Sequence, residues 1–189
     1  MYDFFAYMSR MKYIKRWSLM RSTEEENIME HSLQVAMIAH ALSVIKNLYF
    51  GGNLNPDRIA VLAMYHESSE VITGDLPTPI KYSNPTISAA YKHLEKLADD
   101  KLLTMLPSEM KNYYQDIIKP DAEEYKIVKM ADKISAYLKC LDELKSGNKE
   151  FLRARDAQLM DIEANITEEA RYFLDNFAPS FDKSLDELN

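Results

Sequence analysis

The chain has 189 residues, of which 47% are hydrophobic and 28% charged, the composition of an ordinary globular protein with one sizeable core. Its net charge of −7 argues against non-specific binding to nucleic acid or to anionic membranes. The single cysteine, Cys140, excludes an intrachain disulfide and is typical of a reducing compartment. The N-terminus has no signal-peptide pattern, and the longest apolar run, Val35 to Ile45, is too short to span a bilayer. We therefore expect a cytoplasmic protein with one domain over residues 1–189.

The sequence predicts helices along almost its whole length, because apolar residues recur at helical spacing and strict alternation is hard to find. A first helix is expected over Asp3–Ile14, with an apolar side made of Phe4, Phe5, Met8 and Met11. The polar stretch "RWSLMRSTEEEN" that follows is expected to be a loop. A second helix, from about Met29 to Leu48, carries one apolar stripe: Ile28, Val35, Ile38, Leu42 and Ile45.

The third predicted helix has clear start and stop signals. Asn55 suits the N-cap and Pro56 the first helical position, and we expect the helix to run to Thr73 and to stop at Gly74. The stretch "DLPTPIKYSNP" is then predicted to be a proline-punctuated loop. Asn84-Pro85 repeats the start signal for a helix with one apolar face: Ile87, Tyr91, Leu94 and Ala98.

The remaining sequence predicts further helices. A short helix is expected after Pro107, and a long one from near Asp121 to Gly147. The last long helix carries the apolar residues Phe151, Leu159, Ile162, Ile166, Phe173 and Phe177. We therefore predict an all-α fold, a single bundle-like domain of six or seven helices.

Ionisable side chains lie on the inward faces of the second and third predicted helices. On a helical wheel His31 falls in the middle of the apolar stripe of the second helix. His66 and Glu70 share the apolar face of the third helix, and Glu67 lies beside them. Each residue alone is explained by a hydrogen-bonded core position or a local His–Glu contact. Two inward histidines with carboxylates, whose burial without partners would be costly, favour a metal or catalytic centre.

Three segments resemble the motifs of the HD-domain phosphohydrolases: "EHSLQVAMIAHAL", "AMYHESSEVITGDLPTPIKY" and "KMADKISAYLKCLDEL". The resemblance is closest to the bacterial 5′-deoxynucleotidases, because "GDLPTP" follows the motif helix and an Arg-Trp pair precedes the first histidine. It extends over nearly the whole chain, from "SRMKYIKRWSLMR" to "PSFDKSLDEL", and implies a single HD-type domain.

The family pattern H…HD…D implies four metal ligands here: His31, His66, Glu67 and Asp132. Asp132 lies on the flank of its helix, so its assignment depends on the likeness of "KMAD" to the family motif. Glu67 departs from the family, which has Asp at this position. Its longer side chain could reach a metal, or miss it and leave three protein ligands and an extra water. The donor set suits one divalent transition metal ion: Mn²⁺, Co²⁺, Zn²⁺ or Fe²⁺.

The resemblance also implies catalytic carboxylates. Glu70, one predicted turn past His66, corresponds to the family residue that orients or deprotonates the attacking water. Its alternative role is to hold His66 in its ligating tautomer. Asp75 is implied to be catalytic or substrate-binding, through the leaving oxygen or the sugar, although Asp is also common in such turns. Thr78, in the same loop, is a weaker substrate-binding candidate.

Arg16 and Trp17 are the remaining candidates for substrate binding. A guanidinium can bind phosphate in bidentate fashion, and the tryptophan can form a rigid wall against the sugar. In the similar deoxynucleotidases this pair contributes to phosphate binding and to rejection of the ribose 2′-hydroxyl. The alternative is a basic loop with a core tryptophan. His40 and His93 are interpreted as solvent-facing residues without a role in the site.

Three functions are compatible with this pattern. The first is a metal-dependent 5′-nucleotidase that hydrolyses nucleoside 5′-monophosphates, with a preference for deoxyribonucleotides. The second is an HD-domain phosphohydrolase of another nucleotide, a triphosphate or an alarmone, which should need more basic residues around the pocket. The third is a catalytically weak HD-like module that binds nucleotide or metal, a reading that Glu67 alone favours. The resemblance further implies a homodimer whose substrate is a small nucleotide.

Overall fold

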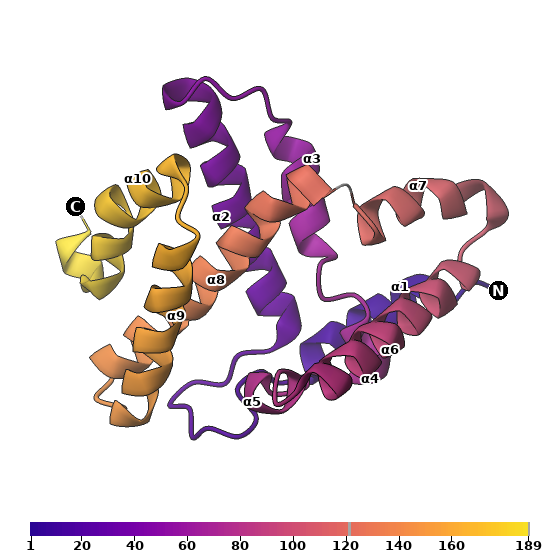
Figure 1. The fold of residues 1–189 in the computed structure, drawn as a ribbon, viewed down its shortest axis with the longest axis horizontal. Helices are drawn as coiled ribbons and strands as arrows, with labels where there is room; N and C mark the ends of the chain where they lie inside the picture. Colours follow the sequence, from indigo (N-terminus) through magenta and orange to yellow (C-terminus); the bar gives the residue numbers. More distant parts are fainter. Residues whose placement is uncertain (121, 189) are drawn as a thin grey trace.

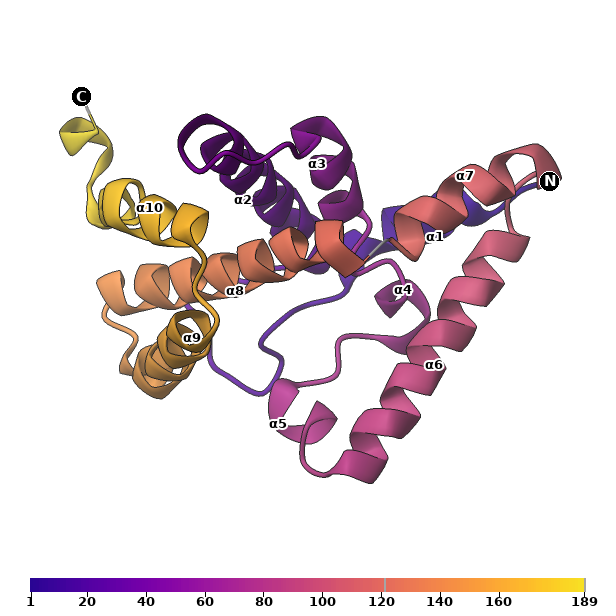
Figure 2. The same ribbon diagram turned by 45° about the horizontal axis from the view of Figure 1, so that its top comes forward.

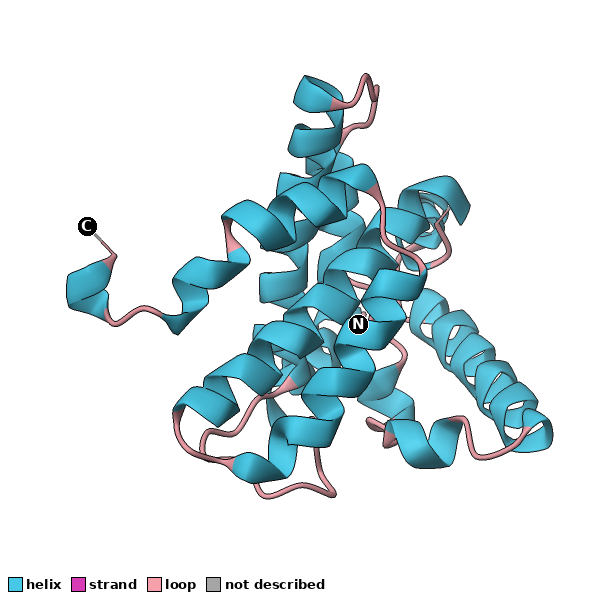
Figure 3. Ribbon diagram, turned by 60° about the vertical axis from the view of Figure 1, so that its left-hand side comes forward, coloured by secondary structure: helices cyan, strands magenta, loops and turns pink. Residues whose placement is uncertain are grey.

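The computed structural model describes residues 1–120 and 122–188, so the predicted helix start at Asp121 lies outside the described residues. Figure 3 shows helices joined by loops throughout the drawn chain. The ten α-helices of the described residues are α1 Phe4–Met8, α2 Ile28–Tyr49, α3 Pro56–Met64, α4 Glu70–Thr73, α5 Thr78–Lys81, α6 Pro85–Thr104, α7 Ser108–Ile118, α8 Ala122–Lys145, α9 Leu152–Ala164 and α10 Glu168–Asn176. Short 3₁₀ turns cover Ser9–Tyr13, Lys149–Phe151, Ala178–Asp182 and Leu185–Glu187. The predicted all-α class is confirmed.

The core of the fold is built around α2, which packs against α3, α8 and α10. In Figure 1, α8 crosses α2 at the centre, α9 and α10 lie on one side of this crossing, and α1 and α4 to α7 lie on the other. The main apolar cluster joins residues of α2, α3, α8, α9 and α10. A second cluster joins the N-terminal segment to the C-terminal part of α6, through Phe4, Met8, Met11, Ile28, Leu102, Leu103 and Leu106.

α2 is the longest stretch of apolar helix in the fold, and it begins at a strong cap. The side chain of Asn27 accepts hydrogen bonds from the backbone N–H groups of Met29 and Glu30, and the Glu30 carboxylate accepts from the N–H of Asn27. All five residues of its predicted apolar stripe are buried. Among the described residues, α2 alone is long and apolar enough to cross a membrane, but 56% of its apolar window is buried, as in a core helix.

The third predicted helix is interrupted, so the expectation of one helix up to Thr73 is wrong. α3 ends at Met64, turns follow, and α4 begins only at Glu70. Nδ1 of His66 lies 2.7 Å from the carbonyl oxygen of Ala63. In a continuous helix that oxygen would accept the backbone N–H four residues later, so the imidazole competes with the helix at this point. The interruption removes His66 and its neighbour Glu67 from any helix face.

The predicted helices at the two ends of the chain are also divided. The first expected helix is α1 followed by a 3₁₀ turn, and Phe5 is 53% exposed, in contrast to the predicted inward position. The last expected helix splits into α9 and α10 at Asn165 to Thr167. Thr167 has the extended backbone of an N-cap residue and is followed by two glutamates, a combination that starts a new helix rather than continuing the old one.

α6 lies at the edge of the molecule, where it packs mainly against α4, α5 and α7, and its C-terminal part joins the N-terminal segment in the second cluster. Figure 2 shows it as a long outer arm. Asn84 caps its first turn, as predicted. Of the four residues expected on its inward face, Tyr91 and Ala98 are buried, whereas Ile87 and Leu94 are exposed. Ile87 and Leu94 remain exposed because α6 is an outer helix and this part of its apolar face is not covered by other described residues.

Candidate metal centre

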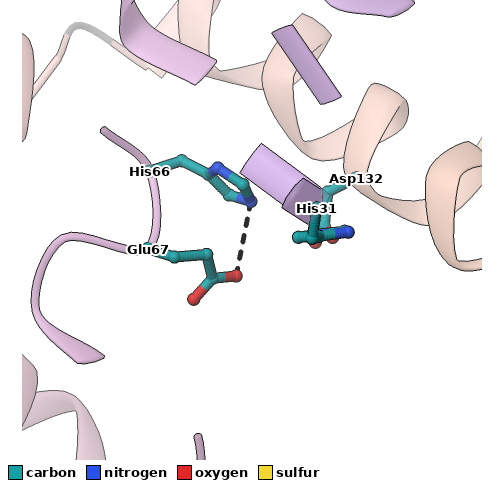
Figure 4. Close-up of side chains that lie close together, drawn as sticks. All are labelled: His31, His66, Glu67 and Asp132. Carbon is teal, nitrogen blue, oxygen red and sulfur yellow. Dashed lines mark hydrogen bonds and ion pairs between the residues drawn. The ribbon is translucent and has the colours of Figure 1, made fainter. Parts of the chain in front are cut away.

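The structure brings the four predicted ligands together. One donor atom from each of His31, His66, Glu67 and Asp132 lies within 4.8 Å of the others. His31 comes from the first turns of α2, Asp132 from the middle of α8, and the other two from the turn between α3 and α4. Figure 4 shows these side chains converging on one point. Segments that are more than 30 residues apart in sequence therefore supply one compact set of nitrogen and oxygen donors.

The buried imidazole of His31 has a defined orientation. The hydroxyl of Ser135 donates to Oε1 of Gln34 at 2.6 Å, so its oxygen can accept from Nδ1–H of His31 at 3.2 Å. Nε2 of His31 then presents its lone pair to Oδ1 of Asp132, which is 2.9 Å away. A nitrogen lone pair and a carboxylate oxygen at this distance repel each other unless a proton or a cation is shared between them.

The imidazole of His66 is oriented in the same way as that of His31, with Nδ1 as donor and Nε2 facing a carboxylate. Its Nδ1 must donate to the carbonyl oxygen of Ala63, which leaves Nε2 as the acceptor. That buried Nε2 has no hydrogen-bond partner among the described residues, and it lies 3.3 Å from Oε1 of Glu67, the contact drawn in Figure 4. Two imidazole lone pairs thus face two carboxylates, which is the donor arrangement that fits a dication.

Electrostatics in the cluster follow from its burial and from its opposite charges. Burial alone would lower the pKa of His66, but the carboxylates of Glu67 and Asp132 raise it above its usual value. Burial would raise the pKa of Glu67, but His66 brings it well below its usual range. The pKa of Asp132 is lowered in the same way, chiefly by the imidazole of His31, whose Nε2 lies 2.9 Å from Oδ1. Both carboxylates are therefore ionised and ready to hold a cation.

Glu70, the predicted catalytic carboxylate, begins α4 and is 5% exposed. Burial raises its pKa to about 11, with further contributions from Glu67, which is also hydrogen-bonded to it, and from Asp75. Glu70 and Glu67 therefore share one proton, which resides on Glu70. A cation held by Glu67 would offset the negative charge that keeps Glu70 protonated.

All four predicted substrate-binding residues line one cavity of about 340 Å³ beside the cluster, which we call the Trp17 cavity. Its walls come from the loop after the first 3₁₀ turn, from the "GDLPTP" loop and from α8 and α9. The lining residues are Arg16, Trp17, Ser18, Leu19, Met20, Asp75, Pro77, Thr78, Pro79, Ala136, Ala154, Ala157 and Gln158. The cavity is largely apolar, with a few polar groups, as expected of a site for a small organic ligand.

Trp17 is fixed as a wall of this cavity. Its ring packs against that of Phe151 with centroids 5.3 Å apart, and its indole N–H donates to Oε2 of Glu26 at 3.0 Å. It is the one non-glycine residue with positive φ in the described chain, at 58°. Such a backbone is unfavourable for a bulky residue, so the surrounding contacts must hold it there.

The guanidinium of Arg16 lies near enough to the metal cluster to interact electrostatically with Asp132 and Glu67. Nη1 is buried without a hydrogen-bond partner among the described residues, and it lies 3.8 Å from Oε2 of Glu26. Burial would lower the pKa of Arg16, but Glu26, Asp132 and other nearby carboxylates raise it. The group is therefore a permanent cation with unused donor capacity beside the cluster.

The "GDLPTP" loop supplies the opposite wall. Gly74 ends α4 with φ of 73°, a conformation that favours glycine, and its carbonyl oxygen accepts from the hydroxyl of Tyr91 at 3.0 Å. This anchor places Asp75 and Thr78 on the cavity. Burial raises the pKa of Asp75, whereas Arg16 opposes that rise.

Sequence reasoning missed Glu26. It is the last of three consecutive glutamates in the polar run "RSTEEEN", and no signal in the run distinguishes the inward one. In the structure its side chain is 11% exposed and lies between Arg16, Trp17 and His31. His40, by contrast, is 46% exposed and near Asp57, and His93 is exposed on α6, so neither is part of the site.

Comparisons with known proteins show the family to which the sequence is similar. The family model described as "5′-deoxynucleotidase YfbR-like" matches residues 3–181. A 5′-deoxynucleotidase of Vibrio parahaemolyticus is 55% identical over 98% of this chain and 97% of its own length. The 5′-deoxynucleotidase YfbR of Escherichia coli is 53% identical over 98% of this chain and 95% of its own length.

Solved structures share the fold. An HD-domain phosphohydrolase of Listeria innocua superposes with a TM-score of 0.83 at 24% identity, covering 95% of this chain and 88% of that one. The HD phosphohydrolase DatZ of cyanophage S-2L, solved with dA and one catalytic Zn²⁺ ion, superposes with a TM-score of 0.68 at 17% identity. That match covers 95% of this chain and 96% of the phage protein.

Proposed function

The chain belongs to the YfbR-like family of 5′-deoxynucleotidases, and on this premise we propose that it hydrolyses deoxyribonucleoside 5′-monophosphates to deoxynucleoside and phosphate. It is a metal-dependent phosphoric monoester hydrolase. The observation that carries the proposal is the position of the Trp17 cavity beside a cluster of four donor atoms within 4.8 Å of one another. An apolar cavity suits the nucleoside, and the donor cluster with Arg16 suits the phosphate.

His31, His66, Glu67 and Asp132 would hold one divalent transition metal ion. Their fit is supported by the two imidazole lone pairs that face carboxylate oxygens. Such an ion supplies charge neutralisation at the phosphoryl oxygens and acidifies water. The donor set accepts Mn²⁺, Co²⁺, Zn²⁺ or Fe²⁺, and the similar phage enzyme contains Zn²⁺. In this proposal Glu67 is a ligand despite being longer than the usual Asp, because its turn brings the carboxylate to the cluster.

The other residues bind the substrate and move a proton. The free donors of Arg16 would bind two oxygens of the phosphate. Glu70 would take the proton of the attacking water. It would be ionised for this step when a cation on Glu67 offsets the negative charge that otherwise keeps Glu70 protonated. Asp75, which keeps a raised pKa, would protonate the leaving 5′-oxygen or hydrogen-bond the sugar. Thr78 would contact the substrate from the same loop.

Trp17 would set the preference for deoxyribonucleotides. Its ring is held by Phe151 and Glu26, so it cannot easily withdraw from the sugar. A 2′-hydroxyl placed against this wall would clash or lose its water partners. Discrimination between the two sugars would therefore depend on the rigidity of the wall.

The alternative substrates are less favoured. Relatives that are 53–55% identical to this chain are named 5′-deoxynucleotidases, and Arg16 is the one basic side chain among the described residues that line the Trp17 cavity, where the nucleoside would lie. A silent binding module would not require Glu70 to be buried beside the donor cluster, where its burial is costly.

We also propose that residues 1–189 form one domain that works in the cytoplasm as a homodimer. Exposed apolar side chains on α2 and α6 support an interface between copies: Met29, Leu33, Met37, Ile87, Leu94 and Leu97. Sedimentation equilibrium at micromolar concentration tests the oligomeric state, and a monomeric mass would refute it. A single calorimetric transition tests the domain assignment.

The function is tested by hydrolysis assays with matched deoxy- and ribonucleoside 5′-monophosphates, after metal removal and after addition of each candidate ion. We expect metal-dependent release of phosphate, faster from the deoxy substrates. Hydrolysis of triphosphates in preference to monophosphates would favour the second function, and absence of hydrolysis with every ion would refute the proposal.

A further inference from the structure

The donor cluster itself lines a cavity other than the Trp17 cavity. A cavity of about 400 Å³ is lined by three of the four proposed ligands, His66, Glu67 and Asp132. None of the residues that line this cavity also lines the Trp17 cavity. No donor residue of the cluster lines the Trp17 cavity, but Arg16 and Asp75 of its lining interact electrostatically with Glu67, so the cluster adjoins both cavities.

Lysines from three helices surround the second cavity, which we call the lysine cavity. They are Lys81 of α5, Lys92 of α6, and Lys129 and Lys133 of α8. Lys81 is paired with Glu95 at 2.7 Å and Lys133 with Asp161 at 2.9 Å. Within the described part of the chain, neither Lys92 nor Lys129 has a carboxylate partner, although Lys129 lies over the ring of Tyr125 at 5.0 Å. These two ammonium groups are available to an anion.

The balance of charge in the lysine cavity favours an anion once a dication is bound. Glu67 and Asp132 would then serve as ligands, and Glu95 is already neutralised by its lysine. Burial raises the pKa of Asp99, the last carboxylate of the lining, to about 7, so it is only partly charged at neutral pH. The dication and its two carboxylates then cancel, so Lys92 and Lys129 leave a local surplus of positive charge on a chain with a net charge of −7.

The two cavities differ in the ligand chemistry that they suit. Leu19, Met20 and several proline and alanine residues make the Trp17 cavity apolar, which suits a nucleoside. Serines, tyrosines and charged groups make the lysine cavity polar, which suits a small hydrated oxyanion. The hydrolysis proposed above produces one molecule of each kind, at the donor cluster that adjoins both cavities.

We propose that the lysine cavity is an oxyanion site through which inorganic phosphate leaves the donor cluster, while the deoxynucleoside leaves through the Trp17 cavity. This inference rests on the proposed function. It predicts that phosphate binds whether or not the Trp17 cavity is filled, and that Lys92 and Lys129 contribute to phosphate binding without touching the nucleoside.

The test is calorimetric titration of inorganic phosphate into the metal-loaded protein, without turnover. The double variant Lys92→Gln/Lys129→Gln should bind phosphate about fivefold more weakly, as expected for the loss of two partly exposed charge pairs. The matched control is Lys96→Gln/Lys126→Gln, which removes one exposed lysine from each of the same two helices outside the lysine cavity. Equal phosphate affinity in the two double variants would overturn the inference.

A second titration uses protein saturated with 2′-deoxyadenosine. We expect the phosphate dissociation constant to stay within about twofold of its value without the nucleoside, because the two cavities are separate. If 2′-deoxyadenosine and phosphate excluded each other, the inference would be overturned, because both ligands would then occupy the same cavity. Neither titration depends on hydrolysis. Failure to hydrolyse monophosphates would therefore refute the proposed function, whereas the titrations test only whether the lysine cavity binds phosphate.

Discussion

The indole N–H of Trp17 donates a hydrogen bond of 3.0 Å to Oε2 of Glu26. The same oxygen lies 3.8 Å from Nη1 of Arg16, and the other oxygen of this carboxylate lies 3.7 Å from Nδ1 of His31. The backbone N–H of Arg16 also donates to the carbonyl oxygen of Glu26. One half-buried glutamate thus links the two proposed substrate-binding residues to a proposed metal ligand.

Replacement of Glu26 by Gln should therefore loosen this link. The amide keeps the length of the side chain but removes the charge that faces Arg16, so we expect kcat/KM to fall about tenfold, the loss typical of one charge-assisted hydrogen bond. The preference for deoxyribonucleotides should shrink as Trp17 becomes mobile. Since Trp17 is the only tryptophan in the chain, its fluorescence emission reports the change directly.

The neighbouring Glu25 provides the control for this experiment. Its side chain is 70% exposed and pairs with Lys15 on the surface. Glu25→Gln should leave activity, substrate preference and emission unchanged. If Glu26→Gln behaves like Glu25→Gln in all three measurements, Glu26 has no positioning role.

Loss of one imidazole should weaken metal binding. His66→Gln removes a lone pair that faces the other donors, so we expect the affinity for Zn²⁺ or Mn²⁺, measured by calorimetry, to fall by at least about tenfold, since even supporting groups around a metal contribute this much. His40→Gln changes the same residue type at an exposed position and should bind as the unchanged protein does. Similar affinities for the two variants would contradict the proposed centre.

The fold class was predictable from sequence because helix caps and apolar periodicity are local signals. The predicted caps at Asn55 and Asn84 are examples: each side chain accepts one backbone N–H, and α3 and α6 begin at the next residue. The interruption after α3 was not predictable in this way. It depends on the side chain of His66 competing for a backbone carbonyl, and no pattern of apolar residues records that competition.

The site was predictable to different extents. Helical wheels placed His31 inward, and it is fully buried. The same method pointed to His66 for a reason that the structure does not support, since this residue lies in a turn. Asp132 has a 34% exposed side chain on the flank of α8, and only family resemblance identified it. Glu26 had neither signal, because its role arises from tertiary contacts of a loop.

The loop that carries Arg16 and Trp17 should be sensitive to acid through Glu143. This carboxylate is fully buried and accepts hydrogen bonds from Lys139, Asn148 and the backbone and side chain of Thr23. Burial would raise its pKa, but these bonds lower it to about 2. Because the folded pKa lies below the unfolded value of 4.5, the stabilisation is present above about pH 4.5 and is lost as the pH falls toward 2.

Glu143→Gln should therefore lower the free energy of unfolding at pH 7 by about 3 kcal/mol, because the ammonium of Lys139 loses its carboxylate partner and keeps only the carbonyl oxygen of Glu24. Between pH 4.5 and 2 the stability of the unchanged protein should fall more steeply than that of the variant. Urea unfolding at a series of pH values measures both effects. Parallel curves for the two proteins would show that Glu143 is not the titrating group.

Glu70 offers a test that separates catalysis from stability. Its folded pKa of about 11 lies far above the usual 4.5, so unfolding at neutral pH releases a proton and the metal-free protein loses stability as the pH rises from 4.5 toward 11. Glu70→Gln removes this titration. We expect the variant to be more stable than the unchanged protein at pH 9 in the presence of a chelator, as judged by thermal unfolding.

The same substitution should reduce kcat about 10²- to 10⁴-fold, the usual contribution of a general base, while metal affinity changes little. A residue that only held His66 in its tautomer would instead weaken metal binding, so the two measurements distinguish the alternatives. Glu109→Gln, at an exposed position of α7, is the control for both assays. We expect a catalytic role because the buried position of Glu70 is costly for stability and catalysis explains why it is kept. Full activity in Glu70→Gln would exclude that role.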